Sequence, residues 1–525
     1  MGRKRIIGVL LFFCVLFSSV SGAAITSAAQ SGIMCGDVDQ NGEINAIDFA
    51  LLRKHLLGMS ELTGDALKAA DVNFDGSVNS IDIAVLKMHL LGMKLLPTGG
   101  QTEKKFEKVE DALMTYSGLT VVSYGGYLNG ESFQQDGIIS YNGYQYTAFW
   151  NTNRHVVFAR RALPDGEWKK FEFTDYTNTA NDAHNTISIG ICPNDGTIHL
   201  SFDHHGNDLH YRRSVSGLAA DPANHTWGAA SFGAVTSSLG NTKVTLVTYP
   251  RFITTPEGNM LFEYRYGTSG SGDQYLCEYS GTTQQWTNLG KYVDGISSSI
   301  NAYAHGLSYS KGGKRLHMTW CWRETSDAST NHDLCYIYSD DNGRTWKNNS
   351  GVEVARTGTS FVTKNSAGIK VWTINQNRGL INQEHHIVDA MGRVHVLLGH
   401  MPDSQADDSN FTNARTKSKY FHYWRDTDGT WRRNEMGYSV VENFRGKLAV
   451  SSSNTLYAIL PNLRIASATA EKNWTDWTLI DTRDQGRFFS DPLIDLNRLY
   501  SEDKLTVLCP VEKSPNIYAL TYNLK

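Results

Sequence analysis

Two twelve-residue segments near the N-terminus repeat each other, and this repeat restricts what that part of the chain can form. The first runs from Asp37 to Asp48, and the second runs from Asp71 to Asp82. In both segments side-chain oxygens stand at positions 1, 3, 5 and 12, a backbone carbonyl is available at position 7 and glycine stands at position 6, which is how a loop wraps a calcium ion. The predicted calcium ligands are Asp37, Asp39, Asn41, Glu43 and Asp48 in the first loop and Asp71, Asn73, Asp75, Ser77 and Asp82 in the second.

Each loop leads into a similar apolar segment, Leu51–Met59 in the first copy and Val85–Met93 in the second. Aspartate instead of glutamate at position 12, and a missing or shortened helix before each loop, depart from a standard EF-hand. This pattern resembles the type I dockerin module, which residues 35–97 cover from end to end. The resemblance implies two bound Ca2+ ions, a cohesin domain of a scaffoldin as partner, and membership of a cellulosome. The alternative is a calcium-stabilised spacer without a partner.

The extreme N-terminus predicts export. Residues 1–23 contain three consecutive basic residues, an uncharged apolar run and small residues before a cleavage site, which together are typical of a signal peptide. No later stretch approaches the about 20 apolar residues that span a membrane, so we expect a secreted, extracellular protein without a membrane partner. Residues 98–109 are predicted to be a flexible linker.

The composition excludes one large class of partner. The chain has 49 Lys and Arg against 53 Asp and Glu, a formal net charge of −4, and no basic cluster outside the predicted signal peptide, so nucleic acid is not an expected partner. Aromatic residues make up 11% of the chain, which favours β structure and sugar-stacking surfaces. Six cysteines follow the signal peptide without a CxxC pair and are predicted to be free, buried thiols.

Tryptophans recur after turns in the remaining region, residues 110–525. They are Trp168, Trp227, Trp286, Trp346, Trp431 and Trp477. Alternating strands begin after glycine turns at residues 195–202, 257–264, 313–320 and 392–398. A repeat of this length holds four short strands, which predicts an all-β fold, a seven-bladed β-propeller, behind the small all-α calcium-binding module.

The count of seven adds a last blade to the six tryptophan repeats. Its strands are expected at Leu505–Leu508, at Ile517–Leu520 and near Leu119–Ser123. Six or eight blades are also compatible with the sequence, which does not show which chain end closes the ring. The segment Ser339–Trp346 resembles the Asp box hairpin of sialidase-type propellers, which is architectural and carries no catalytic role.

Histidine, tyrosine and arginine are concentrated in the second and third repeats, at residues 181–185, 202–211, 248–252 and 263–273. Together these segments resemble the BNR-repeat propeller family that includes the ulvan lyases and the lyases cutting rhamnosyl-glucuronate linkages. The resemblance covers most of residues 110–525. It implies the catalytic residues His184, His205, Tyr249 and Arg265. Because the same family contains an α-L-rhamnosidase branch, glycoside hydrolysis stays open as an alternative to elimination.

Elimination has specific chemical needs. It removes the weakly acidic proton at C5 of a uronate and expels the substituent at O4, while the ionised carboxylate opposes the developing charge. Cations or hydrogen-bond donors must therefore neutralise that carboxylate. The planar guanidinium of Arg265 matches a carboxylate, and His205 or Arg323 is expected to assist it.

Two residues compete for the role of base. Either Tyr249 or His184 is expected to accept the C5 proton, and Tyr249 is also able to return one to the leaving oxygen. A tyrosine base needs a lowered pKa, which we expect Arg265 and Arg251 to provide. The predicted substrate contacts are Arg251, Arg323 and His204.

Other interpretations of the polar residues stay open. His199, His317 and His395 recur at one place in their repeats and are expected to be structural, hydrogen-bonded residues. Candidate zinc ligands by residue type are Cys321, Cys335, His305 and His332. A glycosidase needs two carboxylates flanking the bond. The candidates Glu324, Glu384, Asp136 and Asp203 form no recognisable pair.

A third function is also compatible with the sequence. The propeller region would then only bind an acidic polysaccharide, and the dockerin would bring it to the scaffold. In every case the dockerin favours acidic plant polysaccharide, of the rhamnose-glucuronate type, as the substrate or ligand.

Overall fold

The computed structural model describes residues 33–73, 77–91, 96, 106–119, 128–130, 137–488, 490–511 and 513–524. The predicted signal peptide, most of the predicted linker, Asp75 and Asp136 lie outside these residues. The chain divides into two compact units, Met1–Thr102 and Glu103–Lys525. Among the described residues no helix has the length and apolar character needed to cross a membrane.

The smaller unit contains three helices, α1 (Ala46–Leu56), α2 (Gly64–Ala70) and α3 (Ser80–Leu90). Asn45 and Asn79 cap α1 and α3, and each capping box is completed by Asp48 or Asp82, the last residue of a predicted loop. The seven-residue α2 precedes the second loop, so the shortened helix expected there is confirmed. Apolar side chains from both copies share one core.

The larger unit consists of mainly antiparallel sheets whose strands are consecutive in the chain. One sheet contains β2 (Ile138–Tyr141), β3 (Tyr144–Trp150), β4 (Val156–Ala162) and β5 (Lys169–Phe173). The next contains β6 (Ile187–Cys192), β7 (Thr197–Phe202) and β9 (Tyr211–Arg213), and a hairpin of β10 (Ser238–Leu239) and β11 (Thr242–Lys243) follows.

An eleven-stranded sheet occupies the middle of the chain. Its first part contains β8 (His205–Asn207), β12 (Val247–Thr254), β13 (Met260–Thr268), β14 (Ser271–Ser280) and β15 (Gln285–Val293). Its second part contains β16 (Asn301–Tyr309), β17 (Leu316–Arg323), β18 (Asn331–Ser339), β19 (Thr345–Lys347), β20 (Glu353–Arg356) and β21 (Lys370–Trp372). One parallel bridge, between Gly272 and Asn301, joins β14 to β16.

Three more four-stranded sheets complete the unit. The first contains β22 (His385–Val388), β23 (Val394–His400), β24 (Lys419–Arg425) and β25 (Trp431–Ser439), with α4 (Phe411–Lys417) between β23 and β24. The second contains β26 (Lys447–Val450), β27 (Leu456–Leu460), β28 (Arg464–Ala468) and β29 (Thr478–Asp481). The third contains β30 (Leu493–Ile494), β31 (Lys504–Pro510), β32 (Ile517–Asn523) and β1 (Glu107–Thr115), with α5 (Leu496–Glu502) before β31.

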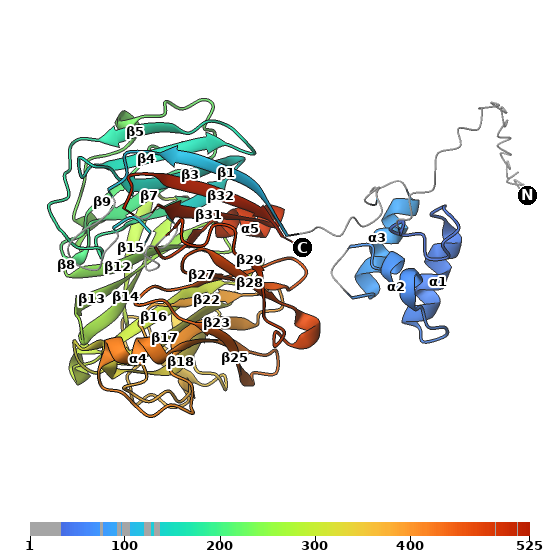
Figure 1. Ribbon diagram of the computed structural model, residues 1–525. Coiled ribbons are helices and arrows are strands. Elements are labelled where there is room, and N and C mark those ends of the chain that lie inside the picture. Colours follow the sequence, from blue (N-terminus) through green and yellow to red (C-terminus); the bar gives the residue numbers. More distant parts are fainter. Residues whose placement is uncertain are drawn as a thin grey trace, which may run out of the picture. The chain divides into compact units, whose positions relative to one another are not determined.

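The two ends of the larger unit meet in that last sheet. β1 pairs antiparallel with β32, so the blue N-terminal strand of this unit lies beside the red C-terminal strand in Figure 1. We expected the closing N-terminal strand near residues 119–123, but it is Glu107–Thr115, and residues 120–123 lie outside the described residues. Residues 107–109, which the sequence assigned to the linker, therefore belong to a strand. The two expected C-terminal strands are confirmed as β31 and β32.

Five of the six recurring tryptophans lie in a strand or directly before one, whereas Trp227 lies in the segment between β9 and β10. Trp168 and Trp477 directly precede β5 and β29, while Trp286, Trp346 and Trp431 lie in β15, β19 and β25. The four strands predicted after glycine turns are present as β7, β13, β17 and β23. The recurring pattern therefore reflects one sheet architecture used repeatedly.

The Asp box forms the hairpin between β18 and β19. Asp341 accepts hydrogen bonds from Oγ of Ser339 and from the backbone N–H of Thr345, both at 2.7 Å, and the backbone N–H of Gly343 donates to Ser339 at 2.8 Å. Trp346 is completely buried beneath this turn. The contacts are structural, as the sequence predicted.

The predicted structural histidines and thiols are also found where the sheets pack. His199 bonds to Tyr211, His317 to Tyr336 and His395 to His422, and all three predicted residues are buried. The six cysteines are buried and free of disulfides, as expected; they are Cys35, Cys192, Cys277, Cys321, Cys335 and Cys509.

Candidate active site

Three neighbouring strands bring His205 and Arg265 into one row across the sheet. β8 pairs with β12 so that His205 lies opposite Thr248, and β12 pairs with β13 so that Thr248 lies opposite Arg265. Nη2 of Arg265 donates to Oγ1 of Thr248 at 2.8 Å. The row thus places an imidazole and a guanidinium from different repeats at corresponding positions of three paired strands.

A β-bulge in β12 sets the direction of Tyr249. The register between β12 and β13 shifts between Thr248 and Arg251, so Tyr249 and Pro250 together oppose a single residue of β13. Tyr249 has a φ of +57°, which a bulky residue adopts only where its surroundings enforce it. Bulges of this kind re-aim a side chain beside functional sites. The guanidinium carbon of Arg265 lies 5.0 Å from the centre of the Tyr249 ring.

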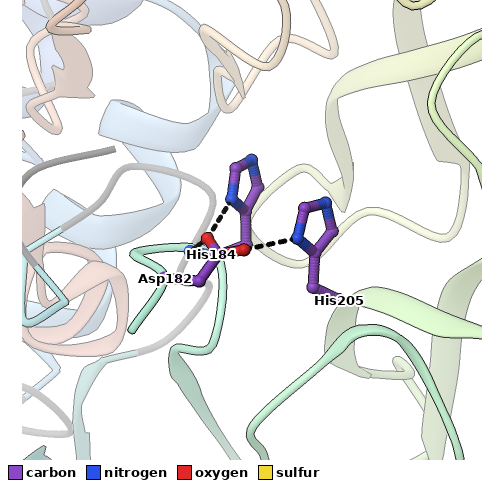
Figure 2. Close-up of side chains that lie close together, drawn as sticks. All are labelled: Asp182, His184 and His205. Atoms are coloured by element: carbon purple, nitrogen blue, oxygen red, sulfur yellow. Dashed lines mark hydrogen bonds and ion pairs between the residues drawn. The ribbon is translucent and has the colours of Figure 1, made fainter. Parts of the chain in front are cut away.

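A carboxylate that the sequence analysis missed joins the two predicted catalytic histidines. Nδ1 of His184 lies 2.5 Å from Oδ1 of Asp182, and Nδ1 of His205 lies 2.6 Å from Oδ2 of the same residue (Figure 2). The two rings stack, with centres 4.1 Å apart and planes at 12°. About a fifth of the His184 side chain and a third of the His205 side chain stay exposed, so a substrate can reach both rings.

The ligand atoms of the same three side chains lie within 4.8 Å of one another, which is close enough to share a metal ion. The ring geometry supports hydrogen bonding instead. Ring nitrogens bind metals along directions in the ring plane, and two nearly parallel stacked rings do not aim those directions at one point. Asp182 is therefore a shared hydrogen-bond acceptor for two imidazoles.

A second phenol, Tyr303, completes the cluster. Nη1 of Arg265 and Nη1 of Arg323 donate to its hydroxyl at 3.4 and 3.3 Å, and Ser269 lies 3.0 Å from the same oxygen. The ring centres of Tyr303 and Tyr249 are 6.1 Å apart. The sequence contained a usable signal: Tyr303 is the third residue of β16, just as Tyr249 is the third residue of β12.

The two phenols differ in their electrostatics. Burial raises the pKa of Tyr249, and the neighbouring Tyr303 adds to this rise, although Arg265 and two other arginines oppose it. Burial also favours the neutral form of Tyr303, but Arg265 and Arg323 outweigh it, so the pKa of Tyr303 is lowered. We expected a lowered pKa for Tyr249; its pKa is instead raised, because burial and the neighbouring Tyr303 outweigh the nearby arginines.

The histidine electrostatics follow from burial and the shared carboxylate. Burial lowers the pKa of His184, His205 and Arg265 lower it further, and Asp182 opposes them. Burial tends to raise the pKa of Asp182, but the hydrogen bonds from the two histidines reverse this and hold it below its ordinary value. At neutral pH the group is therefore one carboxylate with a neutral His184 beside it.

Two predicted substrate contacts lie elsewhere. Arg251 is buried deeper along β12, where Nη1 lies 3.5 Å from Oε2 of Glu263 and Nη2 donates to the carbonyl of Ala304 at 2.9 Å. His204 is 1% exposed, lies 3.0 Å from Oγ of Ser201, and has its pKa lowered to about 3 by burial. Both residues are buried away from the Asp182 cluster, and their role as substrate contacts stays a prediction.

The zinc candidates do not come together in the described part of the chain. The side-chain groups able to share a metal there include none of Cys321, Cys335, His305 and His332. His332 instead lies 3.1 Å from Oε1 of Glu324, and His305 accepts a hydrogen bond from the backbone N–H of Glu384. The structure gives the predicted zinc site no support.

The first predicted calcium loop has the shape of a cation site. Oxygens of Asp37, Asp39 and Asp48 lie within 4.8 Å of one another. Gly42 has a φ of +89°, the left-handed conformation that lets the loop turn around an ion. These donors are carboxylate oxygens, which hard divalent cations prefer.

The second loop repeats the first where it is described. Asp82 accepts hydrogen bonds from the backbone N–H groups of Val72 and Asn73, as Asp48 does from the corresponding residues of its own loop. Asp75 lies outside the described residues. The two loops are therefore similar in structure as well as in sequence.

The fold and the site define a class of protein in which a unit of repeated β-sheets is joined to a small module of two similar loop-helix segments. The profile described as "BNR repeat-containing family member" matches residues 144–438, more than half of the chain, and the dockerin type I domain matches residues 35–91. The chain belongs to the BNR repeat-containing family and carries a dockerin type I domain, which confirms both resemblances found in the sequence.

Curated relatives are ulvan lyases. The long isoform of ulvan lyase from Pseudoalteromonas sp. (strain PLSV) is 26% identical over 263 residues, which are 41% of this chain and 26% of the relative. The long isoform from Glaciecola sp. (strain KUL10) is 22% identical over 377 residues, which are 63% of this chain and 35% of the relative. The chain thus spans about a quarter to a third of the length of these relatives.

Solved structures share the fold of the larger unit. Polysaccharide lyase Uly1 superposes with a TM-score of 0.61 at 18% identity, covering 80% of this chain and 99% of that one. A PL25 ulvan lyase gives a TM-score of 0.59 at 13% identity, covering 78% and 95%. At these identities the likeness shows a common fold.

Proposed function

We propose that this protein is a secreted polysaccharide lyase that cleaves a glycosidic bond to a uronic acid, of the rhamnose-glucuronate type, by β-elimination. The observation that carries the proposal is the convergence of His184, His205, Tyr249 and Arg265, which come from separate segments of the chain. Its curated relatives are ulvan lyases, and one solved PL25 ulvan lyase is bound to -[GlcA(1-4)Rha3S]-, which supports a substrate of this type.

Arg265 and Arg323 form the proposed cradle for the uronate carboxylate. Their Nε–H groups are buried without a hydrogen-bond partner among the described residues, whereas their Nη1 groups hold Tyr303. Within that part of the chain neither guanidinium is paired with a carboxylate, in contrast to Arg251, which is paired with Glu263. Arg265 is buried and lacks a carboxylate partner among the described residues, which favours an anionic ligand, and a carboxylate matches its planar donors.

Proton transfer is assigned to His184 and Tyr249. With Nδ1 donating to Asp182, Nε2 of His184 carries the lone pair that accepts the C5 proton. The C4–C5 double bond forms as the C4–O4 bond breaks, and Tyr249, kept protonated by its raised pKa, donates a proton to the departing oxygen. Arg265 and Arg323 both donate to the hydroxyl of Tyr303 and lower its pKa, so this phenol holds the two guanidinium groups side by side.

Two of the four candidate carboxylates of the rival hydrolase are engaged within the fold. Two carboxylates flanking one bond are needed for that chemistry. Asp203 is engaged by Tyr176 and Asn185, and Glu384 is 1% exposed beside the backbone N–H of Gly399. The α-L-rhamnosidase and pure binding functions remain the alternatives that the product assay below separates.

The proposal extends to the rest of the chain. We infer a seven-bladed β-propeller, in which β1 completes the last blade, supported by the repeated four-stranded sheets and by the pairing of β1 with β32. The dockerin is inferred to bind two Ca2+ ions and the cohesin domain of a scaffoldin, which would place the enzyme in an extracellular cellulosome. An acidic plant polysaccharide is the proposed substrate, since such complexes act on plant material. The domain boundaries we propose are 1–23 and 35–97, followed by a linker that ends before β1 and a larger unit that begins with β1 at Glu107.

The product identifies the chemistry directly. The protein is incubated with ulvan, rhamnogalacturonan and glucuronate-capped arabinogalactan, and ultraviolet absorbance of an unsaturated uronate is recorded beside reducing-sugar release. A lyase raises both signals together, a hydrolase raises only reducing sugar, and a binding module raises neither.

Tyr249→Phe is the decisive variant. It removes the proposed proton donor while keeping the ring, so we expect turnover to fall by about a thousandfold or more, because general acid catalysis contributes about 10^2–10^4-fold. Calcium-dependent cohesin binding is measured on the same sample and should stay unchanged, since it depends on another unit. Normal turnover by Tyr249→Phe would disprove the mechanism.

A further inference from the structure

We propose that Asp182 is a positioning residue that fixes the tautomers of both His184 and His205, and that this bidentate contact, rather than either histidine alone, prepares the base. The inference rests on the proposed function and deepens it. It is carried by one carboxylate whose two oxygens each contact a different Nδ1 atom, at 2.5 and 2.6 Å.

Local backbone geometry holds the carboxylate in place. The backbone N–H of His184 donates to Oδ1 of Asp182 at 2.9 Å, which forms an Asx turn and fixes the side chain within its own loop. Oδ1 therefore receives two donors from His184, whereas Oδ2 receives one from His205. The two oxygens are not equivalent, and this difference makes the proposal testable.

The loops that carry the histidines are clamped to each other. Nδ2 of Asn185 donates to Oδ1 of Asp203 at 2.6 Å, and the backbone N–H of Asp203 donates to the carbonyl of Thr186 at 3.2 Å. The indole N–H of Trp150, a completely buried residue, donates to the carbonyl of Asn185 at 2.8 Å. The carboxylate thus stands between two loops whose separation is fixed.

A shared carboxylate dictates where the protons lie. An ionised carboxylate only accepts hydrogen bonds, so both Nδ1 atoms carry hydrogen, and each ring when neutral presents its lone pair at Nε2. Figure 2 shows the two rings standing on one side of Asp182, with their other nitrogens directed away from it. Because the stacked rings repel each other when charged, the group takes up one substrate proton, and the carboxylate stabilises the imidazolium formed.

Asp182→Asn tests whether Asp182 orients the histidines or only fills space. Asparagine has the same shape, but its side chain offers one acceptor oxygen and one donor NH2 group. The amide oxygen should stay at the Oδ1 position, where His184 supplies two donors. The amide NH2 then faces His205 and forces its proton from Nδ1 to Nε2. His184 keeps its tautomer but loses the negative charge that raises its pKa, so it becomes a weaker base.

The experiment combines kinetics with a direct view of the tautomers. Full-length protein is labelled with 15N-histidine, and the two residues are assigned from His184→Gln and His205→Gln samples. We expect Nδ1–H on both histidines of the parent protein, and Nε2–H on His205 alone in Asp182→Asn. Turnover should fall by about a hundredfold or more, as expected when a catalytic histidine loses its orienting carboxylate, and the acid limb of the pH profile should move to lower pH.

Glu172→Gln is the matched control. Glu172 contacts Nδ1 of His155 in another carboxylate–imidazole pair, on β5 and outside the cluster. Its substitution should leave turnover and the pH profile unchanged.

The possible failures are distinguishable. Absence of unsaturated product from the parent protein removes the proposed function, while the tautomers still test the role of Asp182. Parent-like turnover and pH profile in Asp182→Asn, or Nε2–H on either histidine of the parent protein, overturns the positioning role and leaves the lyase assignment standing.

Discussion

The calcium loop and the candidate active site contain similar polar side chains, but they are assembled in different ways. Every proposed ligand of the first calcium site lies within twelve consecutive residues, and the loop conformation alone brings Asp37 and Asp48 together. The active-site cluster draws His184, Tyr249 and Tyr303 from three parts of the chain. Strand pairing places the two tyrosines, whereas His184 lies in the turn before β6 and contacts Asp182. We therefore expect the calcium loop to depend on its bound ion, and the active-site cluster to depend on the folding of the sheets.

Calcium removal is expected to give the largest contrast. Chelation with EDTA should abolish cohesin binding, because the carboxylates of Asp37, Asp39 and Asp48 repel one another without a cation. Lyase activity should stay unchanged, because the active-site cluster is built from hydrogen bonds. Both quantities are measured on the same preparation, by calorimetry with a cohesin and by ultraviolet absorbance.

Asp48→Ala with Asp82→Ala serves as the matched control for nonspecific effects of the chelator. It should reproduce the loss of cohesin binding in the presence of calcium, with the lyase rate unaffected. Loss of lyase activity on chelation, restored by a divalent ion, would show instead that the larger unit holds a functional metal.

The same difference explains what the sequence could predict. The calcium ligands could be predicted from the sequence because the place of a residue in the loop determines its place around the ion. The repeated sheets could be predicted because the tryptophans recur at similar intervals. Asp182 was missed because nothing in an Asn-Asp-Ala-His segment shows that a second histidine, His205, comes within reach of the same carboxylate. The sequence also does not show that His204 is buried while its neighbour His205 is partly exposed.

A second prediction contrasts two buried arginines. Arg265→Ala should lower kcat/KM by about 10^2–10^3-fold, the loss typical of removing one donor that stabilises transition-state charge. Arg251→Met should instead lower the free energy of unfolding by about 3–5 kcal/mol, since it leaves Glu263 buried without its partner, and should spare kcat. Turnover and urea unfolding of both variants test this pair. A kcat loss in a stably folded Arg251→Met protein would restore the substrate-binding role inferred from the sequence.

The smallest expected effect is a change of slope in the pH profile, which separates the two candidate bases. If neutral His184 is the base, kcat/KM rises about tenfold per pH unit up to its pKa, which burial holds below 6.5, and then levels off. Tyr249, kept protonated as the acid by its raised pKa, should extend this plateau beyond pH 10. Were Tyr249 the base, the rate would keep rising through the alkaline range. A profile measured from pH 4 to 10.5 at constant ionic strength decides between them, because above neutrality a histidine base predicts a flat profile and a tyrosine base a rising one.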